Sequence, residues 1–220
     1  MLGAMSVAPV LLGAMSANAQ APAASSAGRT PTTGISGAVG DNARPRSRNI
    51  GIPSRHFQFT PSIDEAVELC KRAGFDCIEW NIRVGGHVPP DQVATMLPKA
   101  VEAARKAGLK CEQVCNSIQD ANTPYAENIL RAMQEQGIRF YRSSNYFQWN
   151  FDGDLAAQLD ELKVRLATTS ALNAKYNTVA CFHTHPTIGD IGGNVWDFME
   201  VFRELDPATI GFNYDTGHTT

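Results

Sequence analysis

The stretches TVACFHTH at residues 178–185 and TIGFNYDTGH at residues 209–218 decide the fold that this sequence predicts. Each begins with β-branched and aromatic residues, the composition of a buried strand, and ends in polar residues. An apolar pattern with helical spacing lies between them, at residues 194–205, and the dipeptide Asp206-Pro207 ends it. A strand, a helix and a second strand in this order predict two parallel strands joined by a crossover helix.

The same alternation extends upstream to residue 49. Ser62 and Glu65 have the spacing of a capping box, which predicts the start of a helix, and Gly74 marks its end. Asp154 predicts the N-cap of a long helix whose buried stripe should include Leu155. The predicted helices cover residues 62–74, 90–106, 125–136, 154–176 and 194–205. The predicted strands cover residues 50–59, 77–82, 109–115, 138–143, 178–182 and 209–214.

This strict alternation predicts an α/β fold with a parallel sheet, either a doubly wound open sheet or a (β/α)8 barrel. No GxGxxG or GxxxxGK[ST] motif follows a predicted strand, which removes the usual support for a nucleotide-binding open sheet. Polar residues follow or end the strands instead, where a barrel carries its chemistry. They are Glu79, Asn81, Asn116, Ser143, Ser144, Asn145, His183, His185, Asp215 and His218. We therefore predict an incomplete TIM-barrel type fold, with about six of eight strands, over residues 49–220.

Composition describes one ordinary globular domain. The chain has 220 residues, of which 43% are hydrophobic and 19% charged, and its formal net charge is -3. Lys and Arg cluster only at residues 44–48, so no extended basic surface is expected to attract a polyanion. Nucleic acid is therefore not an expected partner.

The amino-terminal residues predict export. The first charged residue is Arg29, and the apolar run Val7 to Met15 precedes Ala17-Asn18-Ala19, a small-x-small cleavage pattern. We interpret residues 1–19 as a signal peptide of the Sec or twin-arginine type, giving a periplasmic or secreted protein that does not stay in the membrane. Because no basic residue precedes the apolar run, the true start is expected upstream. An Ala-rich disordered tail is the alternative.

Residues 20–48 are rich in Ala, Ser, Gly, Pro and Thr and lack an apolar period, so we predict a disordered linker there. The five cysteines form no CxxC pair and fall within predicted helices and strands. We expect them to be buried thiols that act as small apolar side chains.

Two imidazoles end the fifth predicted strand. His183 and His185 alternate with Thr184, so both side chains should point to the same side. The next strand delivers Asp215 and His218 to the same edge. Nitrogen and oxygen ligands without a thiolate suit Mn, Mg, Co or Zn, and such an ion can polarise a sugar carbonyl and its neighbouring hydroxyl. Hydrogen bonding to loop backbone is the alternative for the imidazoles, and helix capping is the alternative for the carboxylate.

Several motifs resemble one family. Gly192-Gly193-Asn194-Val195-Trp196-Asp197, Leu205-Asp206-Pro207, Ile210-Gly211 and Tyr214-Asp215-Thr216-Gly217-His218 resemble the sugar phosphate isomerase/epimerase family of xylose isomerase-like TIM barrels. The resemblance extends from Asn49 to the end of the chain. It implies a divalent metal held at the ends of strands five to eight, with Glu, Asp, His and Glu as the usual ligands in order.

The resemblance also implies roles for individual residues. Asp215 matches the second metal ligand, and His183 stands at the position of the first, where a His-Asn-His version of the family pattern also occurs. His185 and His218 match positions that contact substrate hydroxyls, and we assign them to substrate binding and catalysis. Glu79 is a further catalytic candidate, with a structural salt bridge as the alternative, and we assign Asn116, at the predicted mouth, to substrate binding.

The resemblance implies a metal-dependent isomerase or epimerase of a small sugar or polyol, acting by proton transfer next to a carbonyl. The last two ligands of the family pattern have no counterpart before Thr220, so we expect this chain itself to be an inactive fragment with exposed sheet edges. A periplasmic sugar-binding or lyase-like protein on the same barrel is the alternative, and an apurinic endonuclease ranks below it. The oligomeric state stays open.

Overall fold

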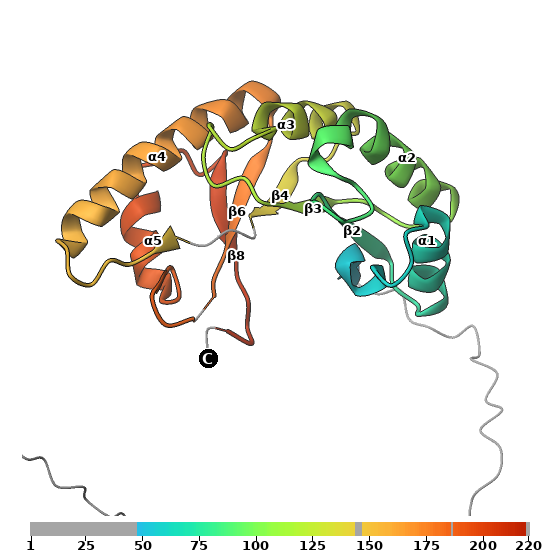
Figure 1. The fold of residues 1–220 in the computed structure, drawn as a ribbon, viewed down its shortest axis with the longest axis horizontal. Helices are drawn as coiled ribbons and strands as arrows, with labels where there is room; N and C mark the ends of the chain where they lie inside the picture. The colour runs from blue at the N-terminus through green and yellow to red at the C-terminus, as the bar shows by residue number, and fades with distance from the viewer. Residues whose placement is uncertain (1–47, 144–146, 186, 219–220) are drawn as a thin grey trace, which may run out of the picture. The chain divides into compact units, whose positions relative to one another are not determined.

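A computed structural model describes residues 48–143, 147–185 and 187–218, all of which belong to one compact unit. Six strands form one parallel sheet in the order β1-β2-β3-β4-β6-β8 (Figure 1). They are β1 Gly51–Pro53, β2 Cys77–Asn81, β3 Gln113–Asn116, β4 Phe140–Ser143, β6 Val179–His183 and β8 Ile210–Asn213. Sequential strands are spatial neighbours in the same direction, so the predicted barrel-type sheet is confirmed, with six strands and an unclosed barrel.

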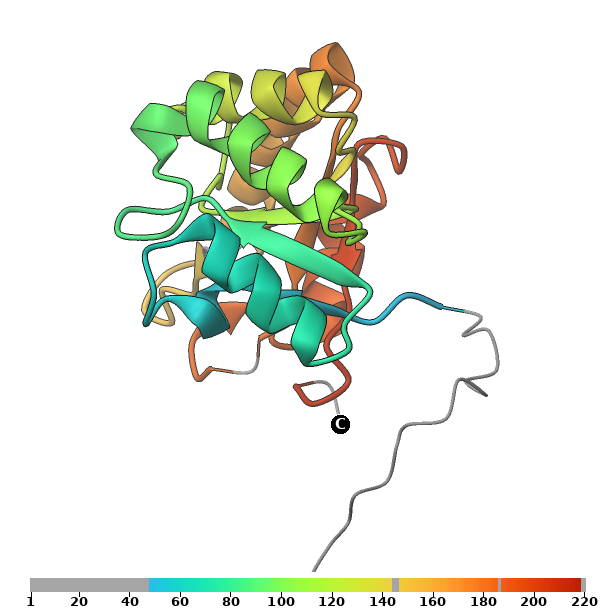
Figure 2. The same ribbon diagram turned by 90° about the vertical axis from the view of Figure 1, so that its right-hand side faces the viewer.

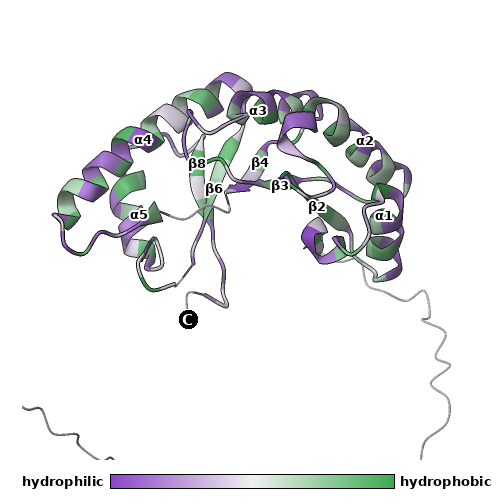
Figure 3. Cartoon of the chain, in the orientation of Figure 1, coloured by the Kyte–Doolittle hydropathy of each residue, from purple (hydrophilic) through white to green (hydrophobic). Residues whose placement is uncertain are grey.

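The α-helices of the described residues cover one face of this sheet (Figure 1). They are α1 Ile63–Arg72, α2 Val93–Lys106, α3 Ala126–Glu135, α4 Leu155–Tyr176 and α5 Val195–Phe202. Each helix contacts the next in chain order, and Figure 2 shows α1 (teal) and α2 (green) as neighbours in that layer. The helices carry hydrophilic and hydrophobic residues in alternation along their length (Figure 3), as expected for elements with one buried face.

The core lies between the helices and the sheet. Along β2, Ile78 and Trp80 are essentially inaccessible to solvent and belong to the main apolar cluster. Because side chains alternate along a strand, the intervening Glu79 and Asn81 point to the opposite face. The face that the helices leave uncovered is thus polar along β2. In a closed barrel of this type, that face lines the interior.

The first predicted strand is largely wrong. Only Gly51–Pro53 of residues 50–59 is a strand, and a 3-10 helix, η1 Ser54–Phe57, follows at once. The backbone N–H of Asn81 donates to Ser54 Oγ at 2.9 Å, and the N–H of Arg55 donates to Asn81 Oδ1 at 3.1 Å. These two bonds turn the chain across the end of β2, which a local strand propensity does not register.

The two predicted N-caps are confirmed, whereas the helix predicted from residue 90 begins at Val93. Ser62 Oγ accepts the N–H of Glu65, and Asp154 Oδ1 accepts the N–H groups of two α4 residues. The reciprocal half of the capping box is absent, because the Glu65 carboxylate accepts from Thr60 Oγ1. Leu155 is 42% exposed, so its assignment to the buried stripe of α4 is wrong: the first turn of α4 extends past the core. A second 3-10 turn, η2 Pro90–Gln92, precedes α2.

A short antiparallel ribbon escaped the sequence analysis. β5 Phe147–Gln148 pairs with β7 Asp190–Ile191, and the two strands follow β4 and β6 in the chain. Two-residue strands carry too little periodicity to be recognised. The ribbon ties the loop after β4 to the loop after β6.

Among the residues that the structure describes, β1 and β8 each pair on one side only, which confirms the predicted sheet edges. No helix in that part is long and apolar enough to cross a membrane. The five cysteines are free, and four of them are buried as predicted. Cys181 is only partly buried, so the prediction is wrong for that thiol. The predicted signal peptide and nearly all of the predicted linker fall in residues 1–47, outside the described residues.

Gly192 follows the ribbon and has a left-handed φ of +88°. An added Cβ would lie 1.9 Å from the Phe198 ring in the core. Overpacking and the unfavourable φ together should cost about 2 to 4 kcal/mol, so we predict that Gly192→Ala lowers the urea midpoint markedly. Gly211→Ala is the matched control, because no atom lies within 4 Å of its added Cβ. Equal stability of the two variants would contradict this packing.

Candidate metal centre and active site

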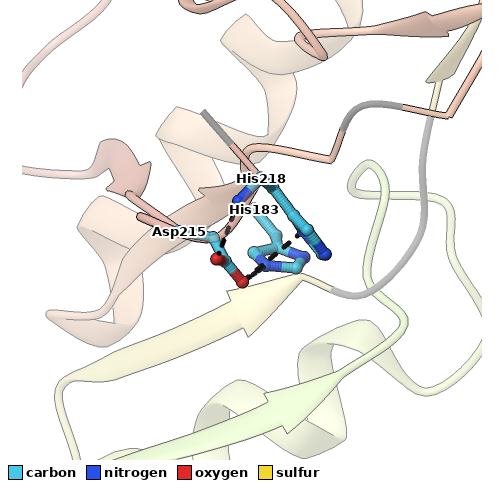
Figure 4. A group of neighbouring side chains, drawn as sticks. All are labelled: His183, Asp215 and His218. Carbon is cyan, nitrogen blue, oxygen red and sulfur yellow. Dashed lines mark hydrogen bonds and ion pairs between the residues drawn. The ribbon is translucent and has the colours of Figure 1, made fainter. Parts of the chain in front are cut away.

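The candidate centre forms where β6 and β8 end. The two strands are parallel neighbours, and His183 lies opposite Asn213 in their register. Asp215 follows two residues later and returns toward β6, so His183 Nε2 and Asp215 Oδ2 come within 2.9 Å (Figure 4). The predicted convergence of these two side chains is therefore present.

A tight turn brings the third side chain. Asp215 Oδ1 accepts the N–H of Gly217 at 2.8 Å and the N–H of His218 at 3.2 Å. This carboxylate-centred turn places His218 Nδ1 3.5 Å from Asp215 Oδ2. One ligand atom from each of His183, Asp215 and His218 lies within 4.8 Å of the others.

Thr184 holds the loop after β8 in place. Its side chain is fully buried, and its Oγ1 accepts the N–H of Asp215 at 3.0 Å. Its own N–H donates to the carbonyl of Asn213 at 3.3 Å. The residue between the two imidazoles therefore fixes the carboxylate of the neighbouring strand end.

The surroundings shift the pKa of both His183 and Asp215 downward, which favours the neutral imidazole and the ionised carboxylate. Burial lowers the pKa of His183, and the nearby charge of Arg142 adds to this, against the opposing effect of Asp215. The hydrogen bond from His183 lowers the pKa of Asp215. Because the folded-state pKa of His183 lies below its unfolded value, stability contributed through this ring falls as the pH drops below about 6.5.

These residues fit a divalent ion. Two ligands about 2.1 Å from a tetrahedral ion lie roughly 3.4 Å apart, and the 2.9 and 3.5 Å separations from Asp215 Oδ2 bracket that value. His218 Nδ1 is buried and has no hydrogen-bond partner in the described part of the chain. A buried nitrogen of this kind is costly unless something binds it. Ligation requires a neutral imidazole and a carboxylate, and binding of an ion at His183 Nε2 would displace the hydrogen that this atom shares with Asp215.

His185 joins the group from the loop after β6. Its ring centroid lies 4.8 Å from that of His218 and 5.8 Å from that of His183. On its other side, His185 Nδ1 lies 3.0 Å from Asp190 Oδ2. Sequence reasoning missed Asp190, because the ribbon that holds it was not predicted. An acidic residue a few positions after the HxH motif was the available signal.

Glu79 is engaged in a buried ion pair. Its carboxylate pairs with Arg142 at 3.0 Å and accepts from Gln113 Nε2 at 2.6 Å, and both charged side chains are about nine-tenths buried. Arg142 belongs to β4, 63 residues away. This is the salt bridge that the sequence analysis kept as the alternative, and the ion pair lies inside the sheet's polar face.

Asn116 lines a cavity that the histidines of the centre do not line. It is buried at the end of β3, and its Oδ1 accepts the N–H of Ile118 at 3.0 Å. It lines a cavity of about 790 Å³ together with Asn81, Arg83 and Tyr125. The cavity opens at the same end of the sheet as the histidine cluster, because these strands are parallel. Its size suits a small ligand.

Ser143, at the end of β4, is buried, and its Oγ donates to the carbonyl of Ile118 at 2.8 Å. It therefore serves the loop after β3. Ser144 and Asn145, which we also placed at the mouth, lie outside the described residues.

Comparison with known families agrees with this architecture. A family model described as xylose isomerase-like TIM barrel matches residues 67–220, well over half of the sequence. The chain belongs to the xylose isomerase-like TIM barrel family. The family resemblance predicted from the sequence motifs is thereby confirmed. A comparison with curated protein sequences finds no match.

Solved structures share the fold at low sequence identity. 3-Keto-D-glucoside 4-epimerase YcjR from E. coli has a TM-score of 0.61 and 17% identity, over 77% of this chain and 69% of that chain. D-Psicose 3-epimerase from Clostridium cellulolyticum H10 has a TM-score of 0.60 and 12% identity, over 78% of this chain and 64% of that chain. The probable 3-DHS dehydratase AsbF from Bacillus anthracis has a TM-score of 0.60 and 13% identity, over 78% of this chain and 64% of that chain. This chain thus spans about two thirds of their length.

The buried ion pair generates a stability prediction. Glu79→Leu leaves the Arg142 charge buried without its carboxylate, which should cost about 3 to 5 kcal/mol in urea denaturation. The double variant Glu79→Leu/Arg142→Met should recover most of that loss, because it removes both charges. Glu102→Gln, in an exposed pair with Lys106, is the control and should leave stability unchanged. A Glu79→Leu variant as stable as the wild type would contradict the structural role.

Proposed function

We propose that the protein is a sugar isomerase or epimerase that moves a proton next to a carbonyl at a divalent metal centre held by His183, Asp215 and His218. The observation that carries this proposal is the convergence of two imidazoles and one carboxylate within 4.8 Å at the carboxyl ends of neighbouring strands. Chemistry in this type of barrel takes place at that end of the sheet.

The comparisons support the substrate class. Two of the similar solved structures are sugar epimerases by name, a 3-keto-D-glucoside 4-epimerase and a D-psicose 3-epimerase. Both names describe inversion at a carbon of a keto sugar. We infer that a small sugar is the substrate of this protein, bound between the histidine cluster and the cavity lined by Asn116.

The residues of the centre would have different roles. A bound divalent ion would supply electrophilic stabilisation of the negative charge that develops on the carbonyl oxygen. His183, Asp215 and His218 would hold it, two as neutral imidazoles and one as a carboxylate. His218 would then be a metal ligand in place of the substrate-binding and catalytic residue that the sequence analysis expected. His185 lies beside them, within reach of a sugar bound at the centre, and an imidazole there can accept and return a proton.

The donor set also predicts which ion binds. Two imidazole nitrogens and one carboxylate oxygen suit Zn and Co, and then Mn, whereas Mg prefers oxygen ligands and water. We expect calorimetric titration of the metal-free protein to give the tightest binding for Zn and Co, weaker binding for Mn and the weakest for Mg. The affinity should fall in acid, because protonation of the imidazoles competes with the ion.

Substitution of the ligands tests the site. His183→Asn, Asp215→Asn and His218→Asn should each weaken Zn binding by at least about tenfold, because loss of a ligand should cost no less than loss of an outer-shell partner. His56→Asn, at an exposed histidine of η1, should bind Zn like the wild type. Unchanged affinity in all three ligand variants would contradict the proposed centre.

The reaction is tested separately, by solvent deuterium incorporation next to the carbonyl of a panel of ketoses. Metal-dependent exchange that disappears in Asp215→Asn supports the isomerase. Metal binding without exchange across the panel favours the sugar-binding or lyase-like alternative for this chain. One structural neighbour is named as a probable dehydratase, and one fold can serve different reactions.

A further inference from the structure

We propose that Asp190 is a positioning residue for His185: its carboxylate accepts the Nδ1–H of the ring and so fixes the tautomer in which Nε2 is the acceptor. The role of the ring in proton transfer rests on the proposed function above. The juxtaposition of the two side chains does not.

The contact between the two residues dictates the proton's place. His185 Nδ1 lies 3.0 Å from Asp190 Oδ2. An ionised carboxylate can only accept hydrogen bonds, so a favourable contact requires the hydrogen on Nδ1. A bare Nδ1 would instead direct its lone pair at the carboxylate oxygen. Thr187 Oγ1 lies 2.8 Å from the same nitrogen and can share this hydrogen as a second acceptor.

The burial of Asp190 indicates that the fold holds its carboxylate in a fixed position. Its side chain is only 3% exposed, although carboxylates rarely leave water unless they are paired. Each oxygen has a partner: Gln148 Nε2 donates to Oδ1, and His185 approaches Oδ2. A carboxylate this buried, with both oxygens engaged, cannot rotate away to solvent without losing two hydrogen bonds.

The β5–β7 ribbon holds this carboxylate in register. Gln148 lies opposite Asp190 in the antiparallel pair. The N–H of Trp149 donates to the carbonyl of Gly189 at 2.7 Å, and the N–H of Asp190 donates to the carbonyl of Thr187 at 2.9 Å. The ribbon therefore fixes the Asp190 carboxylate on one side of the His185 ring. The backbone of His185 is held by β6, which ends two residues earlier at His183.

The His185 ring lies beside the proposed centre. His185 packs edge-on against His218 at a centroid distance of 4.8 Å, so the ring lies against the proposed metal ligands. The two ring nitrogens direct their bonds in divergent directions. With Nδ1 bound to Asp190, Nε2 of the neutral ring carries its lone pair away from the ribbon. That atom is the proton acceptor for a hydroxyl or C–H group of a sugar bound there, as in other carboxylate-oriented imidazoles.

Long-range 1H–15N correlation spectra of the 15N-histidine-labelled protein, recorded metal-free at pH 8, report the tautomer directly. We expect the Nδ1–H tautomer for His185 in the wild type. In Asp190→Leu the acceptor is gone, and Thr187 can donate to a bare Nδ1, so the ring should change to the Nε2–H tautomer. Thr187→Val is the matched control and should keep the wild-type tautomer, because the carboxylate remains.

An Nε2–H tautomer in the wild type overturns the proposal, and this result needs no variant to fold. An unchanged tautomer in Asp190→Leu, or a change in Thr187→Val, overturns it as well. Zn titration separates the two proposals. Asp190→Leu should bind Zn within about threefold of the wild type, because its three ligands are untouched. Absence of Zn binding in the wild type would end the proposed metal centre but leave the tautomer result standing.

Discussion

The parallel pairing of β6 with β8 is the constraint on which the candidate site depends. It places His183 opposite Asn213, and Thr184 then receives the N–H of Asp215 two residues further on. A shift of one residue in this register would turn His183 into the helix layer, since side chains alternate along a strand. The carboxylate and the imidazole would then no longer meet.

The helix layer fixes that register from the other side. Phe182 precedes His183, is fully buried, and packs at 5.8 Å between ring centroids against Phe198 and Phe202 of α5. Gly192 leaves room for the Phe198 ring, and it also ends the ribbon that carries Asp190. Packing on one face of β6 and chemistry on the other are therefore coupled through adjacent residues, so a defect in the apolar layer should reach the site.

Local patterns predicted the elements that have a local cause. Ser62 and Asp154 begin helices because a side-chain oxygen accepts a nearby N–H, and the alternation of β2 follows from its two-sided packing. The convergence of His183 with Asp215 was also predictable, because strand order alone brings them together. What failed depends on distant partners: the turn after β1 needs Asn81, and the ion pair of Glu79 needs Arg142 from two strands away. Asp190 was missed because the two-residue strand that holds it has no periodicity.

The most direct test of the centre is anomalous X-ray diffraction from crystals of the protein grown with Zn, with data collected on both sides of the Zn absorption edge. We expect one strong anomalous peak about 2.0 to 2.2 Å from His183 Nε2, Asp215 Oδ2 and a ring nitrogen of His218. A peak bound elsewhere, with these three side chains unliganded, would contradict it.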